Sequence, residues 1–187
     1  MRFRRQGVHP TGRAFTGRRL GIFLAAVSIL GVGLTSSAVP ASADYSYETI
    51  VNAHSQQCLT SGGKDDTVAT QYPCNGSPNQ GWAPEGGCIG NSRFCQVINE
   101  STGQCLGVAG SNTKSAGAEV VVWRCDGSEY ENQYWQWQES TAETANFLDN
   151  LNSGLYLTLK CGCDTKSAPM DQEPQNVMGS PSQLWFV

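Results

Sequence analysis

The sequence predicts an all-β protein, and more narrowly a barrel with pseudo-threefold symmetry. The pattern Gln-x-Trp occurs three times, at 80–82, 133–135 and 183–185, with spacings of 53 and then 50 residues. Upstream of each copy lies an Asn, preceded by two apolar residues in the first two copies (50–52 and 97–99) and by Leu-Asp in the third (148–150). Cys-Leu or Tyr-Leu follows this Asn at a constant distance. No window longer than ten residues has a convincing helical period. Many short strands joined by regular turns are typical of β-barrels, and the repeat supplies the threefold symmetry.

The repeat divides residues 44–187 into units of about 45–86, 94–140 and 145–187. Alternating or continuous apolar runs predict strands, among them 47–51, 119–123, 134–138 and 155–160. Turn-forming sequences separate the strands, at 61–66, 109–112 and 126–128. No low-complexity linker interrupts the repeat, so we expect one domain with a single core.

Residues 1–43 differ in composition from the rest and predict a secretory signal peptide. They carry six Arg and no acidic residue, followed by the apolar run 20–34 and by Ala41-Ser42-Ala43. The apolar run is short and rich in Gly for a membrane span, and the small-x-small sequence is a signal-peptidase site. We expect cleavage before Asp44 and export; a membrane anchor is the alternative. The long Arg-rich leader resembles those of Gram-positive bacteria.

Loss of this leader leaves an acidic chain. Six of the twelve basic residues and none of the sixteen acidic residues lie in 1–43, so residues 44–187 carry a formal net charge of −10. Such a surface repels phosphate groups. We therefore expect no nucleic-acid partner and no insertion into a membrane.

All eight cysteines follow the leader, and in an exported protein they predict disulfides. The repeat pairs Cys58 with Cys74 and Cys105 with Cys125, because each pair occupies the same places in its unit. Unit three has Tyr156 and Val177 at these places, so both members of its pair are missing. Four cysteines remain, and we expect either two short bridges or crosslinks between the two pairs: Cys88, Cys95, Cys161 and Cys163. A Cys-x-Cys bridge is more easily reduced than an ordinary one, so a redox role is a second interpretation.

Catalytic and metal-binding patterns are lacking in the sequence. His54 is the only His after the leader, and neither Gly-x-Ser-x-Gly nor His-Glu-x-x-His occurs. Nothing in the sequence places two carboxylates across a cleft for glycoside hydrolysis. We expect no enzyme, no metal site and no cofactor.

Three blocks carry a family resemblance: 97–106, 120–127 and 132–135. They resemble the ricin B-type lectin β-trefoil, which also occurs as a carbohydrate-binding module of secreted bacterial proteins. The resemblance implies a six-stranded barrel with three hairpins, and it places Trp82, Trp135 and Trp185 in the core. A fold does not by itself define a sugar site.

The family's sugar pocket uses an Asp after Cys-Leu, an aromatic ring two residues before the second Cys, and an Asn beside the Gln of Gln-x-Trp. The ring covers the apolar face of a pyranose, and the polar groups hold its hydroxyls. In the three units these positions hold Thr60, Tyr72 and Asn79; Gly107, Trp123 and Asn132; and Thr158, Gln175 and Ser182.

The Asp is thus missing from every unit, and the resemblance implies two candidate sugar sites. The first comprises Trp123 with Asn132 and Gln133. The second comprises Tyr72 with Asn79 and Gln80. Asp65 or Asp66 is a candidate for the missing acceptor in unit one. The alternative interpretation makes Trp123 and Tyr72 half-buried hairpin aromatics without a ligand.

The sequence therefore favours a secreted lectin-like protein whose partners are glycans or cell-surface polysaccharides, bound in shallow hairpin pockets. A second hypothesis keeps the trefoil as a protein-binding module. It is then a subunit of a larger secreted, toxin-like assembly or an inhibitor of an extracellular hydrolase.

Overall fold

The computed structural model describes residues 45–85, 93–110, 113–127, 131–141, 144–176 and 180–187. The predicted signal peptide, 1–43, lies outside them. Within the described part, no helix is long and apolar enough to span a membrane.

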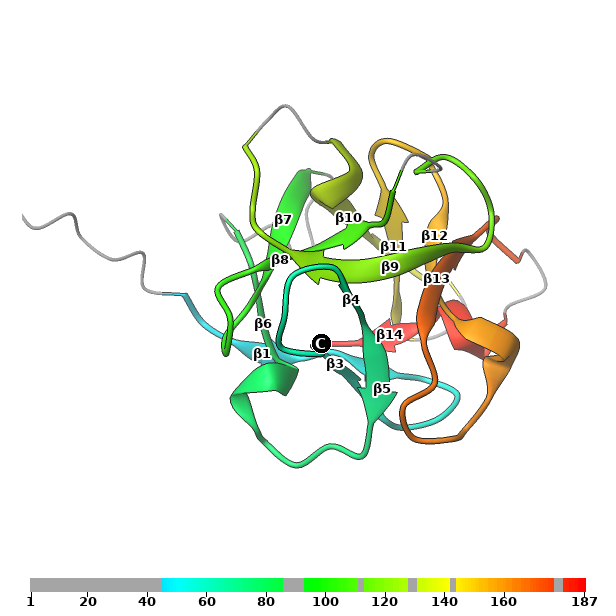
Figure 1. Ribbon diagram of the computed structural model, residues 1–187. Coiled ribbons are helices and arrows are strands. Elements are labelled where there is room, and N and C mark those ends of the chain that lie inside the picture. Colours follow the sequence, from blue (N-terminus) through cyan, green and yellow to red (C-terminus); the bar gives the residue numbers. More distant parts are fainter. Residues whose placement is uncertain (1–44, 86–92, 111–112, 128–130, 142–143, 177–179) are drawn as a thin grey trace, which may run out of the picture. The chain divides into compact units, whose positions relative to one another are not determined.

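Each unit contributes short strands and one or two single 3₁₀ turns (Figure 1). Unit one contains β1 (Glu48–Thr49), β2 (Val51–Asn52), β3 (Cys58–Thr60), β4 (Thr67–Val68), β5 (Thr70–Tyr72), η1 (Pro78–Gln80) and β6 (Gly81–Pro84). Unit two contains β7 (Phe94–Asn99), β8 (Cys105–Val108), β9 (Ala118–Trp123), η2 (Glu131–Gln133) and β10 (Tyr134–Glu139). Unit three contains β11 (Asn146–Asn150), β12 (Tyr156–Leu159), η3 (Lys160–Gly162), β13 (Met170–Glu173), η4 (Pro181–Gln183) and β14 (Trp185–Phe186).

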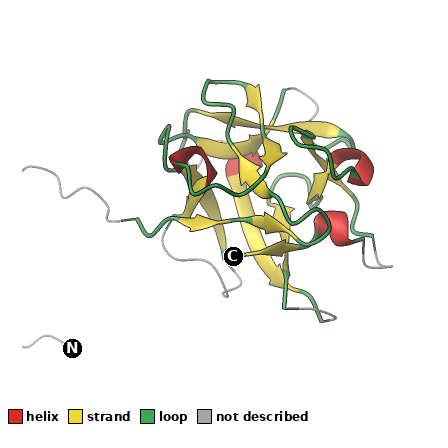
Figure 2. Cartoon of the chain, turned by 90° about the horizontal axis from the view of Figure 1, so that it is seen from below, coloured by secondary structure: helices red, strands yellow, loops and turns green. Residues whose placement is uncertain are grey.

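The first and last strands of each unit close into an antiparallel ring. The pairs run β1–β6, β6–β7, β7–β10, β10–β11, β11–β14 and β14–β2. The inner strands of each unit form the hairpins β3–β5, β8–β9 and β12–β13. Figure 2 shows the 3₁₀ turns at the rim of the strands. The predicted all-β barrel with pseudo-threefold symmetry is thus confirmed.

The three Gln-x-Trp tryptophans fill the centre of the core. Trp82, Trp135 and Trp185 are at most 1% exposed. Each indole Nε1 donates to the carbonyl of the Leu in the Cys-Leu or Tyr-Leu motif of its own unit, at 2.9, 2.9 and 3.2 Å. A buried indole N–H needs such a partner, so the two motifs must recur together. The core role that the resemblance implies for these residues is confirmed.

The repeated Asn of each unit (Asn52, Asn99 and Asn150) joins neighbouring units. In the strand register Trp82 faces Asn99, and the same pairing closes the ring through Trp135–Asn150 and Trp185–Asn52. Each of these buried Asn side chains donates its Nδ2 to two carbonyls of the neighbouring Gln-x-Trp segment. The second repeated pattern is therefore the contact by which one unit binds the next.

Disulfides brace the hairpins of units one and two. Cys58 is bonded to Cys74, and Cys105 to Cys125, as the repeat predicts. Cys161 and Cys163 form the short bridge rather than a crosslink to the other pair. Cys95 is also disulfide-bonded, whereas Cys88 lies outside the described residues.

Replacing Asn99 with Ala is expected to lower the free energy of unfolding by about 2–3 kcal/mol, because the carbonyls of Asn79 and Gly81 each lose one of two donors and the removal of a fully buried side chain leaves a cavity. Urea denaturation measures the change. Ser101→Ala, in the exposed turn that follows Asn99, is the control and is expected to cost less than about 0.5 kcal/mol. Equal effects of the two substitutions would contradict this role of Asn99.

Candidate functional site

The strand register identifies one equivalent surface position in each hairpin. Cys58 faces Tyr72, Cys105 faces Trp123, and Tyr156 faces Glu173. Unit three therefore has Glu173 at the ring position, which corrects the sequence alignment that placed Gln175 there. The segment from this position to the Gln of Gln-x-Trp spans eight residues in unit one but ten in units two and three. The alignment applied the spacing of unit one to unit three.

The Gln of each Gln-x-Trp lies beneath this position. Gln80, Gln133 and Gln183 are all buried. Each Nε2 donates to the carbonyl of the residue after the ring position, in Pro73, Arg124 and Pro174. Each Oε1 accepts a backbone N–H two residues further on. Gln80 and Gln133, expected as sugar contacts, are thus placed below the surface, where they hold the loop that carries the ring.

Thr replaces the family Asp in units one and three, and its hydroxyl is already used. Thr60 Oγ1 donates to the Cys58 carbonyl at 2.9 Å and accepts from Gln80 Nε2 at 3.1 Å. Thr158 makes the same pair of bonds with Tyr156 and Gln183. These hydroxyls hold the hairpin to the core and offer little to a ligand.

In unit two the Trp123 ring itself covers the place of the family Asp. A Cβ on Gly107 would lie 2.6 Å from Trp123 Nε1 and 3.0 Å from Gln133 Cγ. The neighbouring Asn132 is buried and donates its Nδ2 to the Val108 carbonyl at 2.7 Å. A glycine is therefore needed at 107 for the Trp123 ring to lie this close to the hairpin strand. The bond from Asn132 to Val108 ties the loop before Gln133 to the same strand.

The half-exposed Trp123 borders an open depression of about 280 Å³. It is lined by Asp65, Asp66, Trp123, Arg124 and Asp126. The two aspartates come from unit one, because β4 pairs with β9 and carries the preceding loop onto unit two. Asp65 Oδ1 accepts from the Arg124 backbone N–H at 3.1 Å and from Gln104 Nε2.

The structure therefore corrects the placement of the substitute acceptors. Asp65 and Asp66 lie at the ring of unit two, not at that of unit one. Asp65 is fixed by its two donors, and Asp66 is an exposed acceptor beside the indole. Arg124 Nε lies 3.4 Å from Asp126 Oδ1, which compensates that carboxylate.

The equivalent positions of the other units are different. In unit three a depression of about 380 Å³ is lined by Thr158, Glu173, Pro174, Asn176, Ser180, Ser182 and Gln183, without an aromatic ring. In unit one Tyr72 is 38% exposed, and Lys166 Nζ lies 5.7 Å from its ring centroid. Asn79 is half-buried nearby in sequence, and its carbonyl accepts from the Ser61 N–H.

Two buried carboxylates in unit three were not singled out from the sequence. Asp171 is 4% exposed. Burial, and next the charge of Glu173, raise its pKa to about 6, whereas Lys160 lowers it. Burial likewise raises the pKa of Asp149, and burial together with the Asp149 charge raises that of Tyr156. Their burial depends on the pairing of strands from different units, so no local pattern marks them.

Metal binding finds no support in the part of the chain that the structure describes: no three His, Cys, Asp or Glu side chains are grouped to hold an ion.

The closed ring and the three hairpins define a β-trefoil. Residues 38–123 match the family of ricin-type β-trefoil lectin domain-like sequences, which confirms the resemblance stated above. No curated protein matches the chain in sequence.

Solved structures share the fold. The designed threefold-symmetric protein ThreeFoil superimposes with a TM-score of 0.64 at 23% identity, over 74% of this chain and 95% of that one. A ricin B-like lectin of Macrolepiota procera, solved with lactose, gives 0.61 at 19% identity, over 74% and 91%. A mosquitocidal holotoxin gives 0.63 at 22% identity, over 78% of this chain but only 17% of the toxin.

Replacing Gly107 with Ala is expected to displace the Trp123 ring and to cost about 1–3 kcal/mol of stability, because the new Cβ meets a rigid indole and the buried Gln133. Trp fluorescence and urea denaturation report the two effects. Gly127→Ala is the matched control, since open space surrounds a Cβ there. Unchanged fluorescence of Gly107→Ala would contradict the position of the ring.

The raised pKa of Asp171 predicts a pH-dependent stability. A folded-state pKa of about 6 exceeds the unfolded value of about 3.9, so the folded protein binds the proton more tightly and loses stability as pH rises from about 4 to 6. Asp171→Asn is therefore expected to stabilise the protein at pH 7.5 by about 1–2 kcal/mol, and to have little effect below pH 4. Urea denaturation at both pH values tests this, with Asp66→Asn as the exposed control. A loss of stability at both pH values would show instead that the carboxylate is needed.

Proposed function

We propose that the protein is a secreted carbohydrate-binding protein whose principal sugar site is the Trp123 depression. The observation that carries this proposal is the composite site itself: an aromatic ring of unit two beside carboxylate acceptors of unit one. The ring offers an apolar face for a pyranose, and Asp66 offers an acceptor for its hydroxyls. The Macrolepiota lectin of the same fold, solved with lactose, supports a sugar as the ligand.

The other two predicted members of this site, Asn132 and Gln133, are buried and position the site without reaching its surface. Asn132 and Gln133 fix the floor and the loop through bonds to Val108 and Arg124. Their substitution changes binding through the position of Trp123. Such a shallow, open site suits the end or the side of a polysaccharide better than a small enclosed ligand.

Export is part of the proposal. A signal peptide at 1–43, cleaved before Asp44 in a Gram-positive bacterium, accounts for the leader. The disulfides Cys58–Cys74 and Cys105–Cys125 are the kind that persist outside the cytosol.

A protein-binding role is the second candidate function, because unit three keeps a depression but has no ring for a sugar. The fold also occurs within a mosquitocidal holotoxin, of which this chain spans 17%. Under this hypothesis the trefoil is a non-catalytic subunit of a secreted assembly, and a partner protein co-purifies with it.

The main test is a glycan array probed with the purified protein, followed by titration of the best ligand. Trp123→Ala is expected to lower the affinity about tenfold or more, because the stacking surface is lost. Trp123→Phe keeps a ring and is expected to retain most of the affinity. Asp66→Asn is expected to weaken binding about fivefold by replacing a charged acceptor with a neutral one.

Glu131→Gln is the control for Asp66, since it removes an exposed charge that does not line the depression. Thermal unfolding checks that each variant is folded. Undiminished glycan binding by Trp123→Ala would exclude this site. Absence of glycan binding together with a co-purifying protein would favour the second candidate function.

A further inference from the structure

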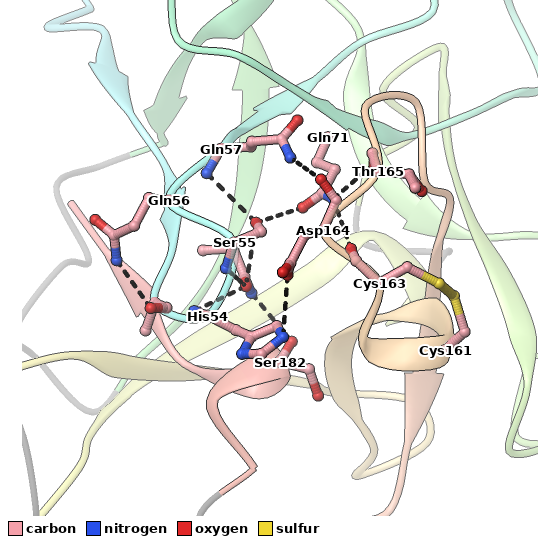
Figure 3. Close-up of polar contacts among 12 residues, drawn as sticks. His54, Ser55, Gln56, Gln57, Gln71, Cys161, Cys163, Asp164, Thr165 and Ser182 are labelled. Carbon is pink, nitrogen blue, oxygen red and sulfur yellow. Dashed lines mark hydrogen bonds and ion pairs between the residues drawn. A yellow bond between two sulfur atoms is a disulfide. The ribbon is translucent and has the colours of Figure 1, made fainter.

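The hairpin loop of unit three, residues 160–168, lies on unit one (Figure 3). Gln71 Nε2 donates to the carbonyls of Cys163 and Thr165 at 2.8 and 2.9 Å. The Ser167 N–H donates back to the Gln71 carbonyl at 2.7 Å. Gln71 is fully buried, and it precedes Tyr72 in β5, so the loop is anchored to the strand that carries the Tyr72 ring.

Two further contacts fix the middle of this loop. Gln57 Nε2 donates to the Asp164 carbonyl at 2.5 Å, and His54 Nε2 lies 3.0 Å from Asp164 Oδ1 (Figure 3). The Cys161–Cys163 bridge closes the start of the loop, where Cys161 and Gly162 both have positive φ. The bridge and these contacts restrict the loop to one path over unit one.

This path brings a lysine to an exposed aromatic ring. Lys166 Nζ lies 5.7 Å from the centroid of Tyr72, within the range of a cation–π contact. Both side chains are exposed, so a ligand reaches them from solvent. Asp164, the carboxylate on the loop, lies 3.0 Å from His54 Nε2, and among the described residues it makes no ion pair with Lys166.

The same arrangement occurs at unit two with the opposite charge. There the loop of unit one reaches the Trp123 ring and supplies Asp65 and Asp66. At unit one the loop of unit three reaches the Tyr72 ring and supplies Lys166. Each of the two aromatic side chains thus meets a loop from the unit that precedes its own unit in the barrel. The residues of that loop set the charge of the site.

We propose that Tyr72 and Lys166 form a second binding site, selective for pyranoses that carry an anionic group. Because Lys166 Nζ lies over the ring, the flexible lysine moves aside when a sugar packs its apolar face against Tyr72. Its ammonium group then pairs with a carboxylate or sulfate on the edge of the sugar. The inference rests on the proposed carbohydrate-binding function and assigns to it a second ligand class, acidic glycans such as uronates or sulfated sugars.

The experiment compares sugars that differ only in charge, on the full-length secreted protein with Trp123 replaced by Ala. The ligands are methyl glucoside and galactoside, the matching uronides, and the matching 6-sulfates. NMR titration following the Tyr ring signals reports binding at Tyr72. We expect the anionic forms to bind about three- to fivefold more tightly than the neutral ones, as one exposed ion pair allows, and the difference to vanish at 1 M salt.

Lys166→Ala is expected to remove this preference, so that charged and neutral glycosides bind alike, whereas Lys166→Arg is expected to keep it. Lys114→Ala removes an equivalent charge from the loop of unit two and is expected to have no effect. Tyr72→Ala is expected to abolish binding of both forms in this background. The uronide and 6-sulfate arms identify which anion is preferred.

Equal binding of charged and neutral sugars, or a preference that survives Lys166→Ala, would overturn the inference. Neutral glycans bound at Trp123 without any anionic preference at Tyr72 would leave the proposed function intact and remove only this second site. Anionic sugars bound at Tyr72 with no effect of Trp123 substitutions would remove the Trp123 site and keep this one.

Discussion

The whole architecture depends on the hydrogen bond between the indole N–H of each Gln-x-Trp and the Leu carbonyl of the same unit. Three tryptophans meet in one core, and each N–H has to be satisfied without water. The bond fixes the first hairpin strand of each unit relative to its last barrel strand. Asn52, Asn99 and Asn150 then join each barrel strand to the next unit, so the ring closes only when all three repeats are present.

The Gln two residues before each Trp connects the buried Trp to the surface loop of its unit. The core holds the Trp, so the Gln is fixed, and its amide holds the loop that carries Tyr72, Trp123 or Glu173. The repeated Gln is therefore an architectural residue at a site that resembles a sugar pocket. This explains why the Gln recurs as Gln183 in unit three, where Glu173 stands in place of the aromatic ring.

The features predictable from the sequence are those that repeat. The barrel and the buried Trp residues follow from patterns present in all three units, and the hairpin disulfides follow from a pattern that units one and two share. The positions of residues that differ between the units were predicted less accurately. Asp65 and Asp66 are close in sequence to Thr60 of unit one, but they lie beside Trp123 of unit two. Loop length decides such placements, and it varies: the two extra residues in unit three moved the ring position from Gln175 to Glu173. The burial of Asp171 could not be predicted, because it depends on the pairing of β13 with β9, a strand of another unit.

A symmetric core with unequal loops produces sites that are equivalent in position and different in chemistry. The loop of unit one brings carboxylates to Trp123, and the loop of unit three brings Lys166 to Tyr72. As proposed, each of these sites alone binds one sugar weakly. Under the proposed function, two sites held on one rigid barrel bind a long polysaccharide together, because attachment at one site raises the effective concentration of the chain at the other. Such a protein distinguishes polymers by the order of their neutral and charged sugars, which a single pocket does not read.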